Sequence, residues 1–234
     1  MTEIVLASNN RKKIAELETF FASASSNEIK VKTLREIGWT EEIEEDGVSF
    51  EENSLIKASV PARLGMIGAA DDSGLSVDIL GGAPGIYSAR YAGENGNDAL
   101  NREKLLRELA GVPAEKRTAR FVCVMTLVLP ERCGLTVPAA WRADAALCEK
   151  RGLDPRRVMN VRGECEGRIL TEERGEGGFG YDSLFWYPDF GATFAEVEQE
   201  RKNLVSHRAR AMAEFTARLV RILESGADCA DETR

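Results

Sequence analysis

The chain has 234 residues, of which 43% are hydrophobic and 30% charged, and its formal net charge is -8. This composition is that of an ordinary globular protein, long enough for one large domain or for two lobes around a cleft. The acidic balance argues against a nucleic-acid partner, which needs a basic face. No apolar run approaches the roughly 20 residues that cross a bilayer, so we expect no membrane partner.

The cysteines and the N-terminus predict where the protein works. The five cysteines have irregular spacings and no CxxC pair, which argues against a disulfide framework or a structural zinc site and favours reduced thiols. The first residues have no basic region ahead of their apolar stretch, so they do not resemble a signal peptide. We therefore expect a cytoplasmic location.

The first third of the chain predicts two strands and two helices. Residues 3–7 indicate a buried strand, and after a polar turn at 8–13 an apolar face recurs at helical spacing. A second strand is expected near 29–33. Ser49 and Glu52 have the spacing of a capping box, which predicts a helix from residue 50 that Pro61 should kink or end.

Two adjacent aspartates, Asp71 and Asp72, are the most informative feature of the sequence. They follow an apolar stretch, and we interpret the run as strand, acidic turn and strand. Neighbouring carboxylates repel one another, so an ordered pair needs a cation or a surface position. Mg²⁺ typically bridges carboxylates to substrate phosphates. With the glycine-rich segment 81–91 the pair indicates metal-assisted phosphate chemistry, although a surface hairpin turn also suits Asp-Ser-Gly.

The rest of the chain alternates further strands and helices, which favours α/β architecture with some antiparallel pairing. The predicted elements are a helix at 98–109, a strand at 120–129, a possible strand at 135–147, a charged excursion or short helix at 148–159, a strand at 163–170, an amphipathic turn within 193–204, a helix capped by Ser206 and running through Leu223, and a disordered tail at 225–234.

Three polar segments are candidate ligand contacts, each with a plainer alternative. The turn at 8–13 precedes a helix, whose free N–H groups suit phosphate, but it can equally be an ordinary polar turn. One glutamate of the acidic run 44–46 can reach the same metal as Asp72, or the run can be a solvated cluster. Lys57 faces either phosphate or solvent.

Two later segments suit recognition of a base. Residues 175–182 place four glycines around Phe179, whose ring can stack on a base, while Asp182 can accept from a base N–H. The alternative is a flexible loop with an incidental aromatic side chain. His207, the only histidine, stands beside Arg208 at a helix start, where both can donate to a carbonyl oxygen; a lone histidine is more often structural.

Together and in this order, the segments resemble the inosine triphosphate pyrophosphatase family, hydrolases of non-standard purine nucleoside triphosphates. The resemblance covers about residues 3–130 and 163–223 and is carried by residues 6–13, 44–58, 70–75, 81–93, 177–182 and 202–208. It implies an elongated, two-lobed mixed β-sheet with flanking helices and a central nucleotide-binding cleft. It also implies a single domain over 1–224, a homodimer, and Mg²⁺-dependent hydrolysis of ITP, dITP and XTP to the monophosphate and pyrophosphate.

The resemblance also assigns roles residue by residue. Asp72 matches the general base, and it matches the metal site together with Glu45 or Glu44 and with Asp71 nearby. The positions that match substrate contacts are Ser8, Asn9, Asn10, Arg11, Lys12, Lys13, Lys57, Ser73, Phe179, Gly180, Tyr181, Asp182, Lys202, His207 and Arg208. Preference for a 6-oxo purine needs a donor that a 6-amino group would leave unpaired, and His207 and Arg208 are the candidates.

The sequence departs from the family pattern in two places. Residues 131–162 are longer than the pattern, and because they lie away from the matched segments we expect an altered surface or dimer edge. Ser183 stands where the family often has proline, which we expect to loosen the base loop.

Three other functions are compatible with parts of this pattern. A related scaffold can act on pyrimidine or methylated nucleotides with a different base, and a substrate panel separates that enzyme. A nucleotide sensor would bind without turnover, against which the carboxylate set speaks. A structural metal-binding protein leaves the glycine loops and residues 206–208 unexplained.

Overall fold

The structure is a computed structural model of the chain, and it describes residues 2–8, 14, 29–93 and 96–231, with side chains through residue 225. The chain divides into two compact units. Unit 1 contains Met1–Asp72, Val124–Arg162 and Ala211–Arg234, and unit 2 contains Ser73–Cys123 and Gly163–Arg210. The predicted helix after residue 13 lies outside the described residues.

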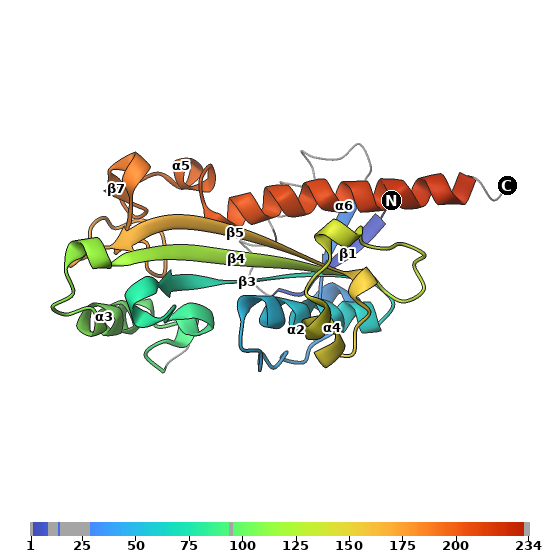
Figure 1. Cartoon of the computed structure of the whole chain (residues 1–234), viewed down its shortest axis with the longest axis horizontal. Helices are drawn as coiled ribbons and strands as arrows, with labels where there is room; N and C mark the ends of the chain where they lie inside the picture. Colours follow the sequence, from blue (N-terminus) through green and yellow to red (C-terminus); the bar gives the residue numbers. More distant parts are fainter. Residues whose placement is uncertain (1, 9–13, 15–28, 94–95, 232–234) are drawn as a thin grey trace. The chain divides into compact units, whose positions relative to one another are not determined.

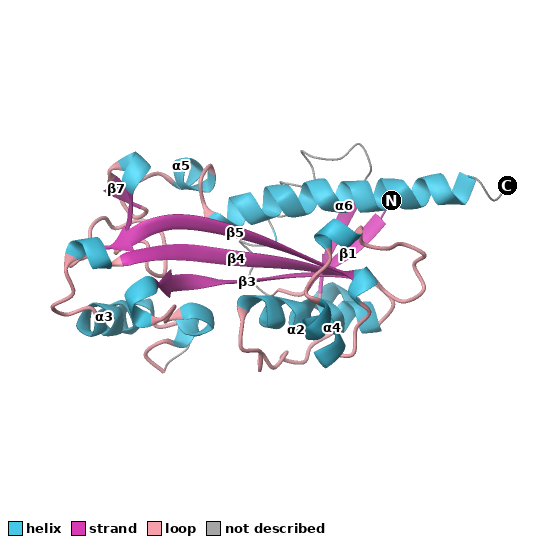
Figure 2. Ribbon diagram, in the orientation of Figure 1, coloured by secondary structure: helices cyan, strands magenta, loops and turns pink. Residues whose placement is uncertain are grey.

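The described strands form one seven-stranded sheet in the order β2-β1-β3-β4-β5-β6-β7 (Figures 1 and 2). Strand β1 pairs in parallel with both β2 and β3, whereas β6 pairs in antiparallel fashion with both β5 and β7. The sheet is therefore mixed, which confirms the predicted fold class. The strands are β1 (Thr2–Leu6), β2 (Ile29–Thr33), β3 (Ile67–Val77), β4 (Thr118–Val128), β5 (Val158–Ile169), β6 (Phe185–Tyr187) and β7 (Ala192–Thr193).

The described helices accompany this sheet in the alternating order that the sequence predicts. They are α2 (Phe50–Arg63), α3 (Asp98–Glu108), α4 (Ala145–Lys150), α5 (Gln199–Asn203) and α6 (His207–Asp231), with short 3-10 helices at Arg35–Ile37, Asp78–Leu80, Gly85–Arg90, Ala114–Lys116, Ala139–Trp141, Pro155–Arg157 and Pro188–Phe190. None of these helices combines the length and the apolar character that crossing a bilayer requires.

The start of α2 confirms the predicted cap with one difference. The Ser49 hydroxyl accepts the backbone N–H of Glu52 at 3.1 Å, as a capping box requires. The Glu52 carboxylate, however, accepts the N–H of Val48 at 3.0 Å, one residue ahead of the cap. The helix ends at Arg63, two residues after Pro61, in agreement with the predicted effect of the proline.

The predicted acidic turn at Asp71–Asp72 is wrong, because β3 continues through both residues as one strand. Asp71 is 5% exposed, so this segment is no surface hairpin. An extended backbone tolerates both charges here because the ammonium of Lys57 lies 3.2 Å from the Asp72 carboxylate and partly neutralises the pair.

One prediction in the second half is also wrong. No strand forms over 135–147: Pro138, which has no N–H for a ladder, precedes a 3-10 helix, and Asp144 caps α4 by accepting the N–H of Leu147 at 2.8 Å. Helix α6 extends through Asp231, into the segment 225–234 that the sequence predicts to be disordered, and the last three residues lie outside the described part of the chain.

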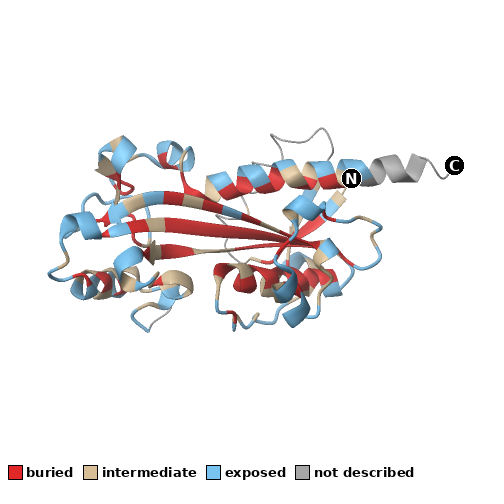
Figure 3. Ribbon diagram, in the orientation of Figure 1, coloured by how far each residue is buried: buried red, intermediate tan, exposed pale blue. Residues whose placement is uncertain are grey.

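Each unit has its own hydrophobic core. The core of unit 1 contains Val5, Leu55 and Val158, and α2 lies so close to β3 that a Cβ on Gly68 would overlap the carbonyl oxygen of Ala58. This close approach brings α2, which carries Lys57, next to the strand that carries Asp72. In unit 2 the rings of Phe121 and Phe185 pack with centroids 4.5 Å apart. Figure 3 shows β4 buried along most of its length.

We predict that Gly68→Ala destabilises the fold, because the new methyl group meets a backbone carbonyl that cannot move alone. The expected loss in the free energy of unfolding is about 3 kcal/mol, measured by chemical denaturation. Gly65→Ala is the control: Gly65 has φ +83° with open space around its Cβ, so it should lose only about 1 kcal/mol. Equal losses would contradict the close packing.

Candidate active site

Two acidic side chains of unit 1, Glu45 and Asp72, meet at Lys57. The Lys57 ammonium lies 2.9 Å from Glu45 Oε2 and 3.2 Å from Asp72 Oδ1. Lys57 comes from α2, Asp72 from β3, and Glu45 from the loop that precedes α2. The lysine and aspartate side chains are only 12% and 14% exposed, so two carboxylates from separate elements converge on one largely buried cation.

Asn53 connects the two sides of this cluster. Its Nδ2 donates to Asp72 Oδ2 at 3.3 Å, and its Oδ1 accepts the backbone N–H of Gly47 at 3.0 Å. Asn53 is 1% exposed, and a Cβ on Gly47 would lie only 2.5 Å from its Oδ1. The amide therefore orients Asp72 and holds the glutamate loop at the same time, and the loop needs glycine at 47.

The electrostatics of the cluster keep Lys57 charged. Burial acts to lower the pKa of Lys57, but the charges of Asp72, Glu45 and Asp71 outweigh it and raise that pKa above its usual value. Burial raises the pKa of the Asp72 carboxyl, and Lys57 opposes this shift. Asp72 is thus a carboxylate whose ionised form depends on a nearby cation.

The donor set fits a hard divalent cation. The described residues contain no group of three or more histidine, cysteine, aspartate or glutamate side chains arranged as a metal site. Mg²⁺ needs no such cage, because it is usually held by one or two carboxylates together with water and substrate phosphates. Glu45 and Asp72 already share one cation. Of the two predicted glutamates, the structure brings Glu45 to Asp72, whereas Glu44 is exposed.

The glycine-rich loop of unit 2 is built around a buried ion pair. Lys202 Nζ lies 2.6 Å from Asp182 Oδ2, and the two side chains are 5% and 3% exposed. The same Oδ2 accepts the N–H of Phe179 at 3.0 Å, and the ammonium lies 4.6 Å from the centroid of the Phe179 ring. Gly178 has φ +75°, and a Cβ there would overlap the Asp182 carboxylate. The ion pair between Lys202 and Asp182 thus holds both the backbone N–H and the ring of Phe179.

The rest of this loop leaves the ring of Phe179 accessible. Phe179 is 50% exposed, whereas Tyr181 is buried and its hydroxyl donates to the Ser88 carbonyl at 2.8 Å. The N–H of Gly180 donates to Asp98 at 2.7 Å, and Arg102 donates to the Gly180 carbonyl at 3.0 Å. A pocket of about 310 Å³ lies beside the loop.

Sequence reasoning missed Asp98 and Arg102. Both line the pocket and fix the backbone of Gly180. They occupy the first turns of α3, where charged residues are ordinarily solvated. No motif in the sequence distinguishes them from other surface charges, so only their position in the fold could have found them.

His207 and Arg208, the two predicted base contacts at the start of α6, have different surroundings. His207 is 8% exposed, and its ring stacks on Phe121 with centroids 5.0 Å apart and planes at 15°. Arg208 Nη2 instead reaches the hydroxyl of Ser73 at 3.4 Å. Ser206 caps the helix as predicted, accepting the N–H of Ala209 at 3.1 Å. The structure therefore brings Arg208 to Ser73 and packs His207 against the aromatic core.

Ser183 is held by hydrogen bonds. The sequence-based expectation was that a serine in place of the family's proline loosens the loop. Its hydroxyl donates to Glu173 at 2.8 Å, and its carbonyl accepts the N–H of Arg174 at 2.9 Å. The residue is 9% exposed. A hydrogen-bonded serine thus holds this position by polar contacts.

The turn at 8–13, which the sequence predicts to contact phosphate, is only partly described. Ser8 is half-buried, and its N–H donates to the Leu6 carbonyl at 2.9 Å. The predicted contacts Asn9, Asn10, Arg11, Lys12 and Lys13 lie outside the described residues.

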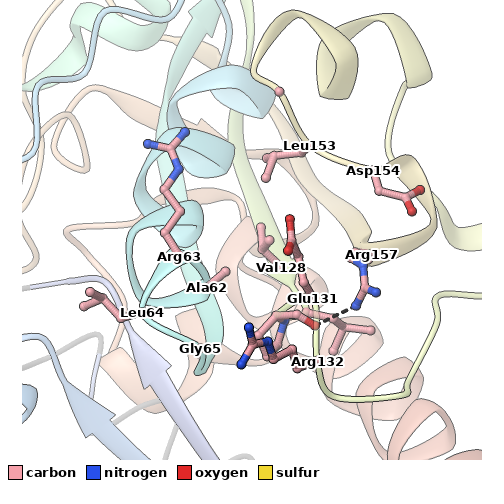
Figure 4. Close-up of a pocket in the computed structure, with 13 residues that line it drawn as sticks. Ala62, Arg63, Leu64, Gly65, Val128, Glu131, Arg132, Leu153, Asp154 and Arg157 are labelled. Carbon is pink, nitrogen blue, oxygen red and sulfur yellow. Dashed lines mark hydrogen bonds between the residues drawn. The ribbon is translucent and has the colours of Figure 1, made fainter.

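A larger pocket, of about 880 Å³, occurs elsewhere in unit 1 and contains none of the predicted site residues. It is lined by the end of α2 and by residues 128–132, 152–154 and 157. Arg63 and Arg132 extend away from one another there, and Arg157 donates to the Pro130 carbonyl at 2.6 Å (Figure 4).

The Ham1 family model matches residues 4–218. The chain belongs to the Ham1 family. Two relatives, both named dITP/XTP pyrophosphatase, are similar over nearly the whole chain. The Bacillus licheniformis protein is 43% identical over 94% of this chain and 98% of its own length, and the Listeria monocytogenes protein is 42% identical over 96% and 98%.

Solved Ham1 structures have the same fold. The Coxiella burnetii HAM1 protein is 36% identical, with a TM-score of 0.79 over 94% of this chain and all of that one. The Staphylococcus aureus Ham1 protein is also 36% identical, with a TM-score of 0.77 over 93% of this chain and 98% of that one. Family and fold both agree with the resemblance that the sequence motifs carry.

We predict that Lys202→Ala destabilises the protein, because it leaves the buried Asp182 carboxylate without its cation. The expected loss in the free energy of unfolding is about 3 kcal/mol. Lys32→Ala serves as the control, since its ion pair with Glu3 is solvent-exposed and should be worth less than about 1 kcal/mol. A similar small loss for both variants in urea denaturation would refute the role of the buried pair.

Proposed function

We propose that this Ham1-family chain hydrolyses non-standard purine nucleoside triphosphates, namely ITP, dITP and XTP, to the monophosphate and pyrophosphate. The observation that carries the proposal is the convergence of Glu45 and Asp72 on one cation, in a chain that is 41–43% identical to proteins named dITP/XTP pyrophosphatase. We further propose Mg²⁺ as the cofactor, a homodimer as the assembly and the cytoplasm as the location.

Asp72 is the proposed general base. Its Oδ2 is held by the amide of Asn53, while its Oδ1 faces the cation position that Lys57 occupies. A carboxylate oriented in this way can accept a proton from the water that attacks the α-phosphorus. When bound by Glu45 and Asp72, Mg²⁺ neutralises the charge of the phosphates. Lys57 remains charged and stabilises the charge that develops on the leaving oxygens.

Residues of unit 2 are the proposed base contacts. The exposed ring of Phe179 offers a surface for stacking, above an ammonium that stays fixed to Asp182. Arg208, which reaches the hydroxyl of Ser73, and His207 at the same helix start are the proposed donors to a 6-oxo group. A 6-amino purine would place a donor against these donors and leave them unpaired, which disfavours adenine nucleotides.

We predict that the purified protein with Mg²⁺ releases pyrophosphate from ITP, dITP and XTP and leaves ATP nearly untouched, because a 6-amino group leaves the proposed donors unpaired. The products are identified by chromatography or phosphorus NMR. Release of single phosphate would contradict attack at the α-phosphorus. Turnover of a pyrimidine or methylated nucleotide would instead support the related-scaffold alternative, and binding without turnover the sensor.

We predict that Asp72→Asn lowers kcat by at least about a hundredfold, because the amide cannot accept the proton. Nucleotide binding, followed by calorimetry, should be largely retained. Asp78→Asn is the matched control: this aspartate is paired with Arg120 at an exposed position and should leave turnover unchanged. Near-normal kcat in Asp72→Asn would remove Asp72 from the role of base.

A further inference from the structure

The segment 131–162, which departs from the family pattern, makes a specific contact with the acidic loop. Arg151 caps the C-terminus of α4, and its Nη2 lies 3.0 Å from Asp46 Oδ1 and 2.7 Å from Glu52 Oε1. Its Nε also donates to Glu52 Oε1 at 2.8 Å. Beside it, Lys150 Nζ lies 2.7 Å from the same oxygen. The segment therefore reaches the acidic loop, a contact that the expectation of an altered surface or dimer edge did not include.

Glu52 is the fixed point of this contact. Its side chain is 2% exposed, and its Oε2 accepts the N–H of Val48 at 3.0 Å. The hydrogen bond from Lys150, followed by those from Val48 and Arg151, holds the pKa of Glu52 at about 2. A buried carboxylate at the first turn of α2 is thus kept ionised by side chains from a segment almost 100 residues away.

The loop that these contacts hold is the one that carries Glu45. Residues 44–48 belong to no helix or strand, so their position depends on side-chain contacts. Asn53 holds the N–H of Gly47 and Glu52 holds that of Val48. The Asp46 side chain is 59% exposed, and among the described residues its one ion-pair partner is Arg151. Without Arg151, the loop would be fixed only on the side nearer α2.

We propose that Arg151 is a positioning residue, which, through Asp46 and Glu52, fixes the loop so that Glu45 faces Asp72. The segment 131–162 thereby controls the geometry of the proposed metal site without touching it. The inference rests on the proposed function for the identity of the metal. The contact with the loop does not depend on that function.

Arginine suits this position better than lysine. A guanidinium presents several N–H donors in a planar fork and can bridge two carboxylates at once. Arg151 does so for Asp46 and Glu52, and its side chain is 22% exposed. Lys150, 58% exposed, has a compact ammonium that pairs with Glu52 and with no other carboxylate of the described residues. Lys150 therefore supports Glu52 but does not restrain the loop at Asp46.

The first test measures amide hydrogen exchange in the full, metal-free protein. Arg151→Ala should raise the exchange rate of peptides covering residues 44–48 by about tenfold or more, while peptides from β4 keep their protection. The matched control is Arg156→Ala in the same segment, because Arg156 pairs with Asp154 only two residues away. Unchanged exchange at 44–48 in Arg151→Ala would overturn the proposal.

The second test separates positioning from a purely structural role. In Arg151→Ala, the Mg²⁺ concentration for half-maximal dITP hydrolysis should rise about tenfold, with kcat at saturating Mg²⁺ nearly retained. Arg151→Lys should recover part of this loss. A fall in kcat with no change in the Mg²⁺ dependence would overturn the role at the metal site.

A third variant covers the case in which Arg151→Ala loses its fold. Asp46→Ala removes only the exposed arm of the contact and leaves Glu52 with both cations. It should show the same faster exchange at 44–48 and the same Mg²⁺ shift with an unchanged melting temperature. If the wild-type protein shows no turnover but Arg151→Ala still speeds exchange at residues 44–48, the proposed function is rejected. The anchoring of the loop by Arg151 then still stands.

Discussion

The ammonium of Lys57 between Glu45 and Asp72 is the interaction on which unit 1 depends. Two ionised carboxylates that are brought together repel one another unless a cation accompanies them, and here that cation is part of the chain. The close contact of α2 with β3 at Gly68 brings Lys57, on the helix, near Asp72, on the strand. Asn53 then fixes the orientation of Asp72. Backbone packing thus determines where charge can be placed.

Unit 2 contains a similar pair with a different consequence. Lys202 and Asp182 are almost sealed from solvent, whereas Glu45 beside Lys57 is 33% exposed. A sealed pair cannot exchange its partner without leaving a buried charge, so Lys202 and Asp182 act as a rigid support for the glycine-rich loop. The partly open pair can give up one contact to an incoming cation or phosphate. Exposure therefore separates the structural ion pair from the pair at the proposed metal site.

Sequence reasoning found the elements that depend on local patterns. Alternating apolar runs, the cap at Ser49 and the cap at Ser206 are local, and the structure confirms most of the described strands and helices they predict. The exception is the strand expected over 135–147, which does not form. The error at Asp71–Asp72 has a non-local cause, because the residue that stabilises an acidic pair within a strand is a lysine from α2. Asp98 and Arg102 were missed for the same reason, since their partner Gly180 lies some 80 residues away.

The segment 131–162 shows how far such non-local effects extend. In the sequence it lies away from every matched motif, which argued for a role at the surface. In the fold α4 lies beside α2 (Figure 1), and Arg151 meets Glu52 across a separation of 99 residues. The acidic loop of the proposed metal site and the segment 131–162 are therefore directly connected. A change in the length of α4 would act on the acidic loop directly, because the guanidinium of Arg151 reaches both carboxylates from the last turn of that helix.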